Sequence, residues 1–164
     1  MDFRYGLALI AVVFALILAS GYIYSDGISR TGHAGSVISE QYDNLPVLSS
    51  SEVKSIGIEV AYVKLINNIE NYVGKIIRYH GKVVEITSYQ DNFYSLHLAT
   101  RKNAADEYQD DVIFVNFKEY SFSAGDLIEV WGMVVGLETY TSISGEEITI
   151  PGIFALHIEP YAEL

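Results

Sequence analysis

The first pattern of hydrophobic and polar residues is an unbroken apolar run near the N-terminus. Residues 6–24 carry no charged side chain, and at the rise of an α-helix they would span about 28 Å, close to the hydrocarbon thickness of a bilayer. Tyr5 precedes the run and Tyr22 and Tyr24 close it, where aromatic rings usually meet lipid headgroups. The run predicts one N-terminal transmembrane helix, with residues 1–24 as a signal anchor.

The charges beside this run set its expected orientation. Arg4 and the free amine precede it and Asp26 and Arg30 follow it, so the positive-inside rule favours a cytoplasmic N-terminus. We therefore expect a single-pass protein of the cell membrane whose C-terminal domain is extracytoplasmic. Residues 19–21 are Ala-Ser-Gly, which also fits a signal peptidase site, and cleavage stays open as an alternative.

A polar stretch and a second periodic pattern follow. Residues 25–51 are rich in Ser and Gly, include Pro46 and show no periodicity, which predicts a flexible linker. From Glu52 to Ile69 apolar residues recur every three or four positions behind a run of serines that could cap a helix. This pattern predicts an amphipathic helix ending near Asn71.

Beyond Gly74 the period changes to two, with β-branched and aromatic residues between turn residues. Strands are predicted at 75–88, 93–99, 111–117, 127–137 and 147–159. Residues 90–92 and Ser144-Gly145 are predicted hairpin turns, and Gly125-Asp126 opens the fourth strand. The first strand is long enough to bend and serve two sheets. We predict a mainly β domain over residues 52–164, a five-stranded OB-fold barrel preceded by the helix.

Two stretches of this domain resemble membrane-anchored and secreted OB-fold proteins of the tRNA-anticodon-like type. The opening stretch matches at Tyr72, Gly74, Lys75, Gly81 and Val83. The closing stretch matches at Gly125, Asp126, Gly132, Gly136, Gly145 and Pro151. The resemblance covers residues 58–159 and implies the fold. It implies no tRNA binding, because OB barrels host many ligands.

Composition narrows the classes of function. The chain has no cysteine, which excludes disulfides, thiolate zinc sites and Cys nucleophiles. Residues 71–164 hold 14 acidic against 6 basic side chains, whereas nucleic-acid binding usually needs a basic footprint. The charge therefore argues against nucleic acid as the main partner.

Alternation along the first predicted strand places three polar residues on its outward face: Arg78, His80 and Lys82. A turn near residue 90 would bring His97 to the same face, beside Lys82 or Val84, with Tyr94 near the turn. Cations for phosphates and rings for bases make this the nearest pattern to an oligonucleotide surface. A solvated strand face above core aromatics is the simpler interpretation.

A second candidate site follows the last strand. His157 and Tyr161 form a His-x-x-x-Tyr pair that is similar to the cytochrome c maturation haem chaperones, which also join one N-terminal membrane helix to an OB barrel. The resemblance implies haem as a cofactor on this pair. A surface histidine on an outward strand position is the simpler interpretation, so no cofactor is the first expectation.

Other polar groups predict little chemistry. Asp106, Glu107, Asp110 and Asp111 crowd one loop without EF-hand spacing, which favours a solvated acidic loop over a Ca²⁺ site. Trp131 and Met133 share one phase of the fourth strand, as core residues would. No catalytic motif is present, so we expect no enzyme and no metal site.

These features together predict a function in binding. The main hypothesis is a membrane-tethered, non-enzymatic, extracytoplasmic OB-fold module that binds a protein partner or an envelope ligand, with residues 6–24 in the membrane. One alternative is a carrier of haem or another small ligand. The other is a weak, strongly salt-dependent binder of single-stranded nucleic acid through Arg78, Lys82 and nearby rings.

Overall fold

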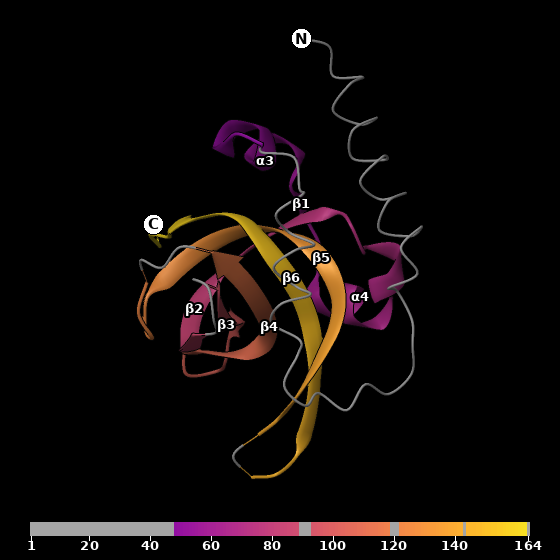
Figure 1. Cartoon of the computed structure of the whole chain (residues 1–164). Helices are drawn as coiled ribbons and strands as arrows, with labels where there is room; N and C mark the ends of the chain where they lie inside the picture. Colours follow the sequence, from indigo (N-terminus) through magenta and orange to yellow (C-terminus); the bar gives the residue numbers. More distant parts are fainter. Residues whose placement is uncertain (1–47, 89–92, 119–121, 143, 164) are drawn as a thin grey trace. The chain divides into compact units, whose positions relative to one another are not determined.

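The computed structural model describes residues 48–88, 93–118, 122–142 and 144–163. Within these residues, two short helices, a 3₁₀ turn and six strands follow one another (Figure 1). Their bounds are α3 Ser50–Ile56, β1 Ile58–Glu59, α4 Tyr62–Asn67, η1 Ile69–Asn71, β2 Ile76–Ser88, β3 Phe93–Lys102, β4 Tyr108–Lys118, β5 Leu127–Thr141 and β6 Glu147–Pro160. The five predicted strands are confirmed, and most of them are longer than predicted.

Strands β2 to β6 close into a barrel in the order β2-β3-β4-β6-β5, with β5 pairing back to β2. The β4–β6 pair is parallel and the other barrel pairs are antiparallel. A five-stranded Greek-key barrel of this kind is the OB fold. The predicted fold class is therefore confirmed for the domain.

The long strand β2 serves both halves of the barrel, as expected. Its first half pairs with β5 and its second half pairs with β3, and Lys82 pairs with a residue of each. Just before this point, a Cβ on Gly81 would lie 2.1 Å from the carbonyl oxygen of Ala99. Only glycine allows the two backbones to approach so closely, and this approach lets β2 pass from one partner to the other.

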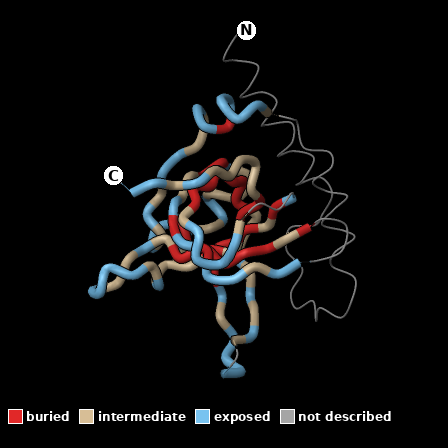
Figure 2. Tube along the Cα trace, turned by 90° about the vertical axis from the view of Figure 1, so that its left-hand side faces the viewer, coloured by how far each residue is buried: buried red, intermediate tan, exposed pale blue. Residues whose placement is uncertain are grey.

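Apolar side chains from alternate positions fill the barrel. Figure 2 shows the buried residues, in red, along the strands of the barrel. The core includes Ile77 and Val83 of β2, Leu96 and Leu98 of β3, and Ile153 of β6. Leu65 of α4 is fully buried in the same cluster. The residues before the first barrel strand therefore contribute to the barrel core.

The predicted helix over residues 52–71 is wrong in one respect, because it is broken into α3, β1, α4 and η1. A Cβ on Gly57 would lie 2.5 Å from Cδ1 of Trp131, so the chain passes directly against this ring. Ile58 and Glu59 then pair in parallel with β2. Tertiary contacts at Gly57 and β1 override the helical period.

Helix α3 packs on the outside of the barrel and forms a second small cluster there. Val53 and Trp131 are buried in this cluster with Ile76. Ser49 and Glu52 form a reciprocal capping box at the start of the helix. Trp131 is buried as expected, but beneath α3 and not inside the barrel.

The predicted transmembrane segment, residues 6–24, lies outside the described residues, as do the linker up to residue 47 and the turn at residues 90–92. Within the described part, no helix has the length and apolar character needed to cross a membrane.

Candidate ligand-binding surfaces

The outer face of β2, β5 and β6 carries polar side chains in neighbouring rows. Arg78, Trp131 and His157 form one row, and His80, Glu129 and Glu159 form the next. Lys82 and Tyr161 flank Leu127 in a third row, where the Tyr161 amide donates to the Leu127 carbonyl. We call this surface the β2–β5–β6 face. It confirms that Arg78, His80 and Lys82 point outward together.

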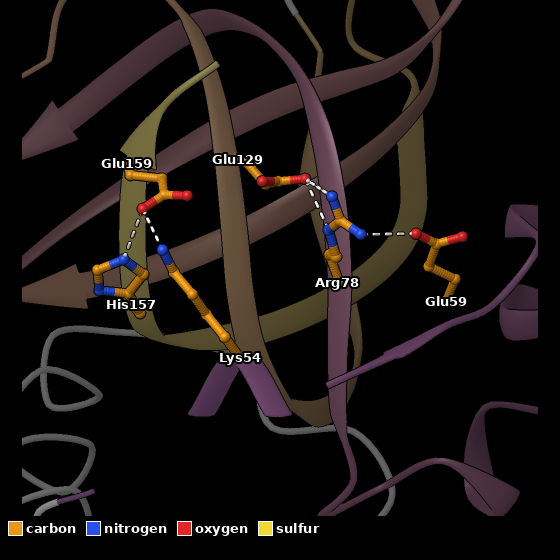
Figure 3. A network of polar contacts seen from close by, with 6 residues as sticks. All are labelled: Lys54, Glu59, Arg78, Glu129, His157 and Glu159. Atoms are coloured by element: carbon orange, nitrogen blue, oxygen red, sulfur yellow. Dashed lines mark hydrogen bonds and ion pairs between the residues drawn. The ribbon is translucent and has the colours of Figure 1, made fainter. Parts of the chain in front are cut away.

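Most charges on this face are paired (Figure 3). Arg78 lies 2.6 Å from Glu129 and 2.9 Å from Glu59. Lys54 of α3 lies 2.5 Å from the carboxylate of Glu159, which also lies 3.1 Å from His157. The hydrogen bond from Lys54, and next that from His157, holds the pKa of Glu159 below its usual value. These pairs join α3 and β1 to the barrel.

Trp131 lies at the centre of these pairs. The Lys54 ammonium lies 5.1 Å and the Arg78 guanidinium 5.5 Å from its ring centroids, within cation–π range. His157 packs on the same ring at 5.6 Å. This arrangement stabilises α3 on the barrel, so Arg78 and His157 have structural partners here.

His80 and Lys82 differ from Arg78 in what they contact. The exposed His80 ring stacks on Tyr161, with centroids 4.4 Å apart and planes at 15°. Lys82 is exposed and has no carboxylate partner among the described residues. An accessible ring pair beside one uncompensated cation is therefore present on this face.

The other two predicted members of the site lie elsewhere. Tyr94 points inward and packs against the barrel core, where it stacks on Phe117 at 5.5 Å. His97 does face outward, but its partner on β2 is Glu85 and not Lys82 or Val84. A register shift between Val83 and Glu85 causes this difference.

The residues of the predicted haem pair have different partners. His157 contacts Trp131 and Glu159, whereas Tyr161 stacks on His80. A haem between them would have to displace the stack and the ion pair. Haem binding stays a prediction that these contacts do not favour.

A second group of rings surrounds His97 on the outer face of β3. Its Nδ1 lies 2.5 Å from the Glu85 carboxylate. The imidazole packs on Phe114 of β4 at 5.3 Å and on Tyr140 of β5 at 4.5 Å. We call Glu85, His97, Phe114 and Tyr140 the His97 cluster. Glu85 and Tyr140 were not predicted, because neither the shifted register nor the path of the β5–β6 hairpin is visible in sequence.

The acidic loop is occupied by internal pairs. Arg101 lies 2.8 Å from Asp111 and Lys102 lies 3.2 Å from Asp106. Hydrogen bonding to Asp111 raises the pKa of Arg101. Among the described residues, no group of three or more potential ligands could hold a metal ion. The carboxylates Asp111 and Asp106 of this loop are therefore paired with Arg101 and Lys102.

Comparison with known proteins adds solved structures of distant similarity. No protein-family model and no curated protein matches the chain. It is similar to a small single-stranded DNA-binding protein from Streptomyces coelicolor at 18% identity, over 52% of this chain and 93% of that one, with a TM-score of 0.36.

Two further solved structures show similarly low sequence identity to this chain. The mitochondrial single-stranded DNA-binding protein Rim1 from S. cerevisiae is 13% identical over 52% of this chain and 90% of that one, with a TM-score of 0.33. A putative aspartyl-tRNA synthetase from Leishmania major Friedlin is 12% identical over 76% of this chain and 25% of that one, with a TM-score of 0.43. Assignment of the OB fold rests on strand order and pairing, and these similarities assign no ligand to this chain.

Proposed function

We propose that this chain is a non-enzymatic OB-fold binding module that binds single-stranded nucleic acid weakly on the β2–β5–β6 face. The observation that carries the proposal is the stack of the exposed His80 on the partly exposed Tyr161, beside Lys82, which has no carboxylate partner among the described residues. Rings of this kind offer a surface on which a base can stack, and a nearby lysine can pair with the adjoining phosphate.

The charges of the β2–β5–β6 face set the expected affinity for nucleic acid. Arg78 and Lys54 are neutralised by Glu59, Glu129 and Glu159. Of the described cations on this face, only Lys82 remains to release a counterion. Each phosphate contact contributes a slope of about −0.7 in log K against log salt for single strands. We therefore propose weak binding with a shallow salt dependence, shallower than the sequence predicts.

A matched pair of lysines tests this proposal. Lys64 of α4, like Lys82, has no carboxylate partner among the described residues, but it lies outside the β2–β5–β6 face. Polarisation of a labelled oligo-dT is measured with the full chain in mild detergent at about 50 mM salt, where the phosphate contribution is large. Lys82→Gln should lower the affinity and flatten the salt slope, and Lys64→Gln should do neither.

The ring stack has its own variant. His80→Ala removes a stacking surface that contributes about 1–3 kcal/mol per base, which is at least about fivefold in affinity. If Lys82→Gln and Lys64→Gln lowered the affinity equally, binding would depend on the overall charge of the protein and not on a site at Lys82. An unchanged polarisation at micromolar wild-type protein would end the proposal.

We propose the cellular location of the module from the sequence. Residues 6–24 would hold the domain at a membrane as a member of the membrane-anchored OB-fold proteins it resembles, with residues 25–51 as the tether. Protease treatment of intact and opened cells tests this placement: the domain should be cleaved from outside in intact cells. A protein partner in the envelope stays a prediction, which crosslinking in native membranes would test.

A further inference from the structure

The His97 cluster holds a polar atom that its surroundings leave unsatisfied. His97 is 8% exposed, and its Nε2 is buried without a hydrogen-bond partner among the described residues. A buried polar atom without a partner costs about 1–3 kcal/mol, so such atoms are rare in folded proteins. Here the unsatisfied atom lies among rings from two other strands.

The partner on the other side of the ring fixes the role of this nitrogen. Glu85 lies 2.5 Å from Nδ1, and a carboxylate there holds a proton on Nδ1. In the neutral ring Nε2 is then a hydrogen-bond acceptor. The group that would satisfy it must donate an N–H or O–H.

The ring of Tyr140 packs against the imidazole of His97, and Tyr140 lies on the β5–β6 hairpin. Gly136 of β5 and Gly152 of β6 face each other in the ladder, and Gly136 has φ +134, where residues with side chains are strained. Tyr140 lies on the hairpin beyond this glycine pair. A change of backbone angle at the pair would lift its ring from His97.

We propose that the His97 cluster is a binding site for a small, neutral, planar heterocycle that donates an N–H to Nε2 of His97, and that Tyr140 occupies the place of this ligand in the structure described. The ligand ring would displace Tyr140 and pack on Phe114. None of the four residues of the cluster is a lysine or arginine, which favours a neutral ligand over an anionic one. This inference does not rest on the proposed function, because it needs neither Lys82 nor His80.

Two probes that differ by one donor group test the site. Adenosine carries an exocyclic amino group, and purine riboside lacks it. The full chain with ¹⁵N-labelled histidine is titrated with each nucleoside, and the Nε2 signal of His97 is followed by NMR. Adenosine should move this signal upfield at saturation, as expected when a nitrogen lone pair accepts a hydrogen bond. Purine riboside should move it far less.

Two variants should change adenosine binding in opposite directions. His97→Phe keeps a packed ring and removes the acceptor, so affinity should fall by about tenfold for one lost hydrogen bond. Tyr140→Ala removes the competing ring, so affinity should rise. Lys64→Gln, on α4 and in neither surface, is the control and should leave the adenosine affinity unchanged. Fluorescence of Trp131 checks that each variant is folded.

Several results would overturn the proposal. These are an immobile Nε2 signal with saturating adenosine, equal shifts with both nucleosides, or unchanged affinity in Tyr140→Ala. If His97→Phe fails to fold, the comparison of the two nucleosides on the wild-type chain still decides. Loss of oligo-dT binding in Lys82→Gln with the adenosine shift retained would separate this site from the β2–β5–β6 face.

Discussion

On the β2–β5–β6 face, His80 is exposed and stacks on Tyr161, and the Lys54–Glu159 and Arg78–Glu59 pairs are partly exposed to solvent. On β3, His97 packs against Phe114 and Tyr140, and its Nδ1 lies 2.5 Å from the carboxylate of Glu85. Exposed ion pairs contribute little to stability, whereas a buried polar group is costly when it loses its partner. The first surface should therefore tolerate substitution, and the second should not.

The largest expected effect lies where β2 passes from one surface to the other. Gly81→Ala would place a Cβ 2.1 Å from the backbone oxygen of Ala99, which no side-chain movement relieves. We expect the loss of about 3 kcal/mol or more of unfolding free energy, measured by urea denaturation. If the variant unfolds like the wild type, Gly81 is not the point that joins the two surfaces.

The next prediction compares two exposed carboxylates. Glu85 and Glu59 are 60% and 76% exposed, but Glu85 pairs with a buried imidazole and Glu59 with a half-exposed guanidinium. Glu85→Ala should cost about 1–2 kcal/mol, because it leaves a second buried nitrogen without a partner. Glu59→Ala should cost less than about 0.5 kcal/mol. Equal losses in urea denaturation would remove the distinction between the two surfaces.

The smallest effect concerns pH at α3. The pKa of Glu159 is held below its usual 4.5, first by the hydrogen bond from Lys54. The ionised Glu159 therefore contributes its full share of the unfolding free energy above pH 4.5, and this share is lost as the pH falls through the lowered pKa. Because the groups are partly exposed, the share is less than about 1 kcal/mol.

The single tryptophan, Trp131, reports this change by its fluorescence. Acidification below pH 4.5 should alter the emission of the wild type. The matched variant Lys54→Met lacks the ion pair and keeps His157, so it should show a flatter acid change. Identical titrations of the two proteins would mean that the pair does not hold α3.

The strands were predictable because a period of two with turn residues between the runs is a local signal. The same alternation correctly placed Arg78, His80 and Lys82 on one outward face. The helical period over residues 52–69 did not predict the break at Gly57, because the ring of Trp131 that meets this glycine lies in a distant part of the sequence.

The candidate sites were predictable only in part, for the same physical reason. A shift of register between Val83 and Glu85 gave His97 a different neighbour. The stack of His80 on Tyr161 depends on β5 lying between their two strands, which is a property of barrel order. The contact of Tyr140 with His97 depends on the path of the β5–β6 hairpin. Contacts of this kind come from closure of the barrel and leave no periodic trace in the sequence.

The docking of α3 has a mechanical consequence. A pull on the chain from the N-terminal side of Ser49 would load α3 before any barrel strand, because the helix is joined to β1 through Gly57 alone. The contacts of Val53 and Lys54 would then open one after another, whereas the barrel ladders share a load across many hydrogen bonds. We therefore expect α3 to detach at a lower force than the barrel strands, with loss of the Lys54–Glu159 pair but not of the His80–Tyr161 stack or the His97 cluster.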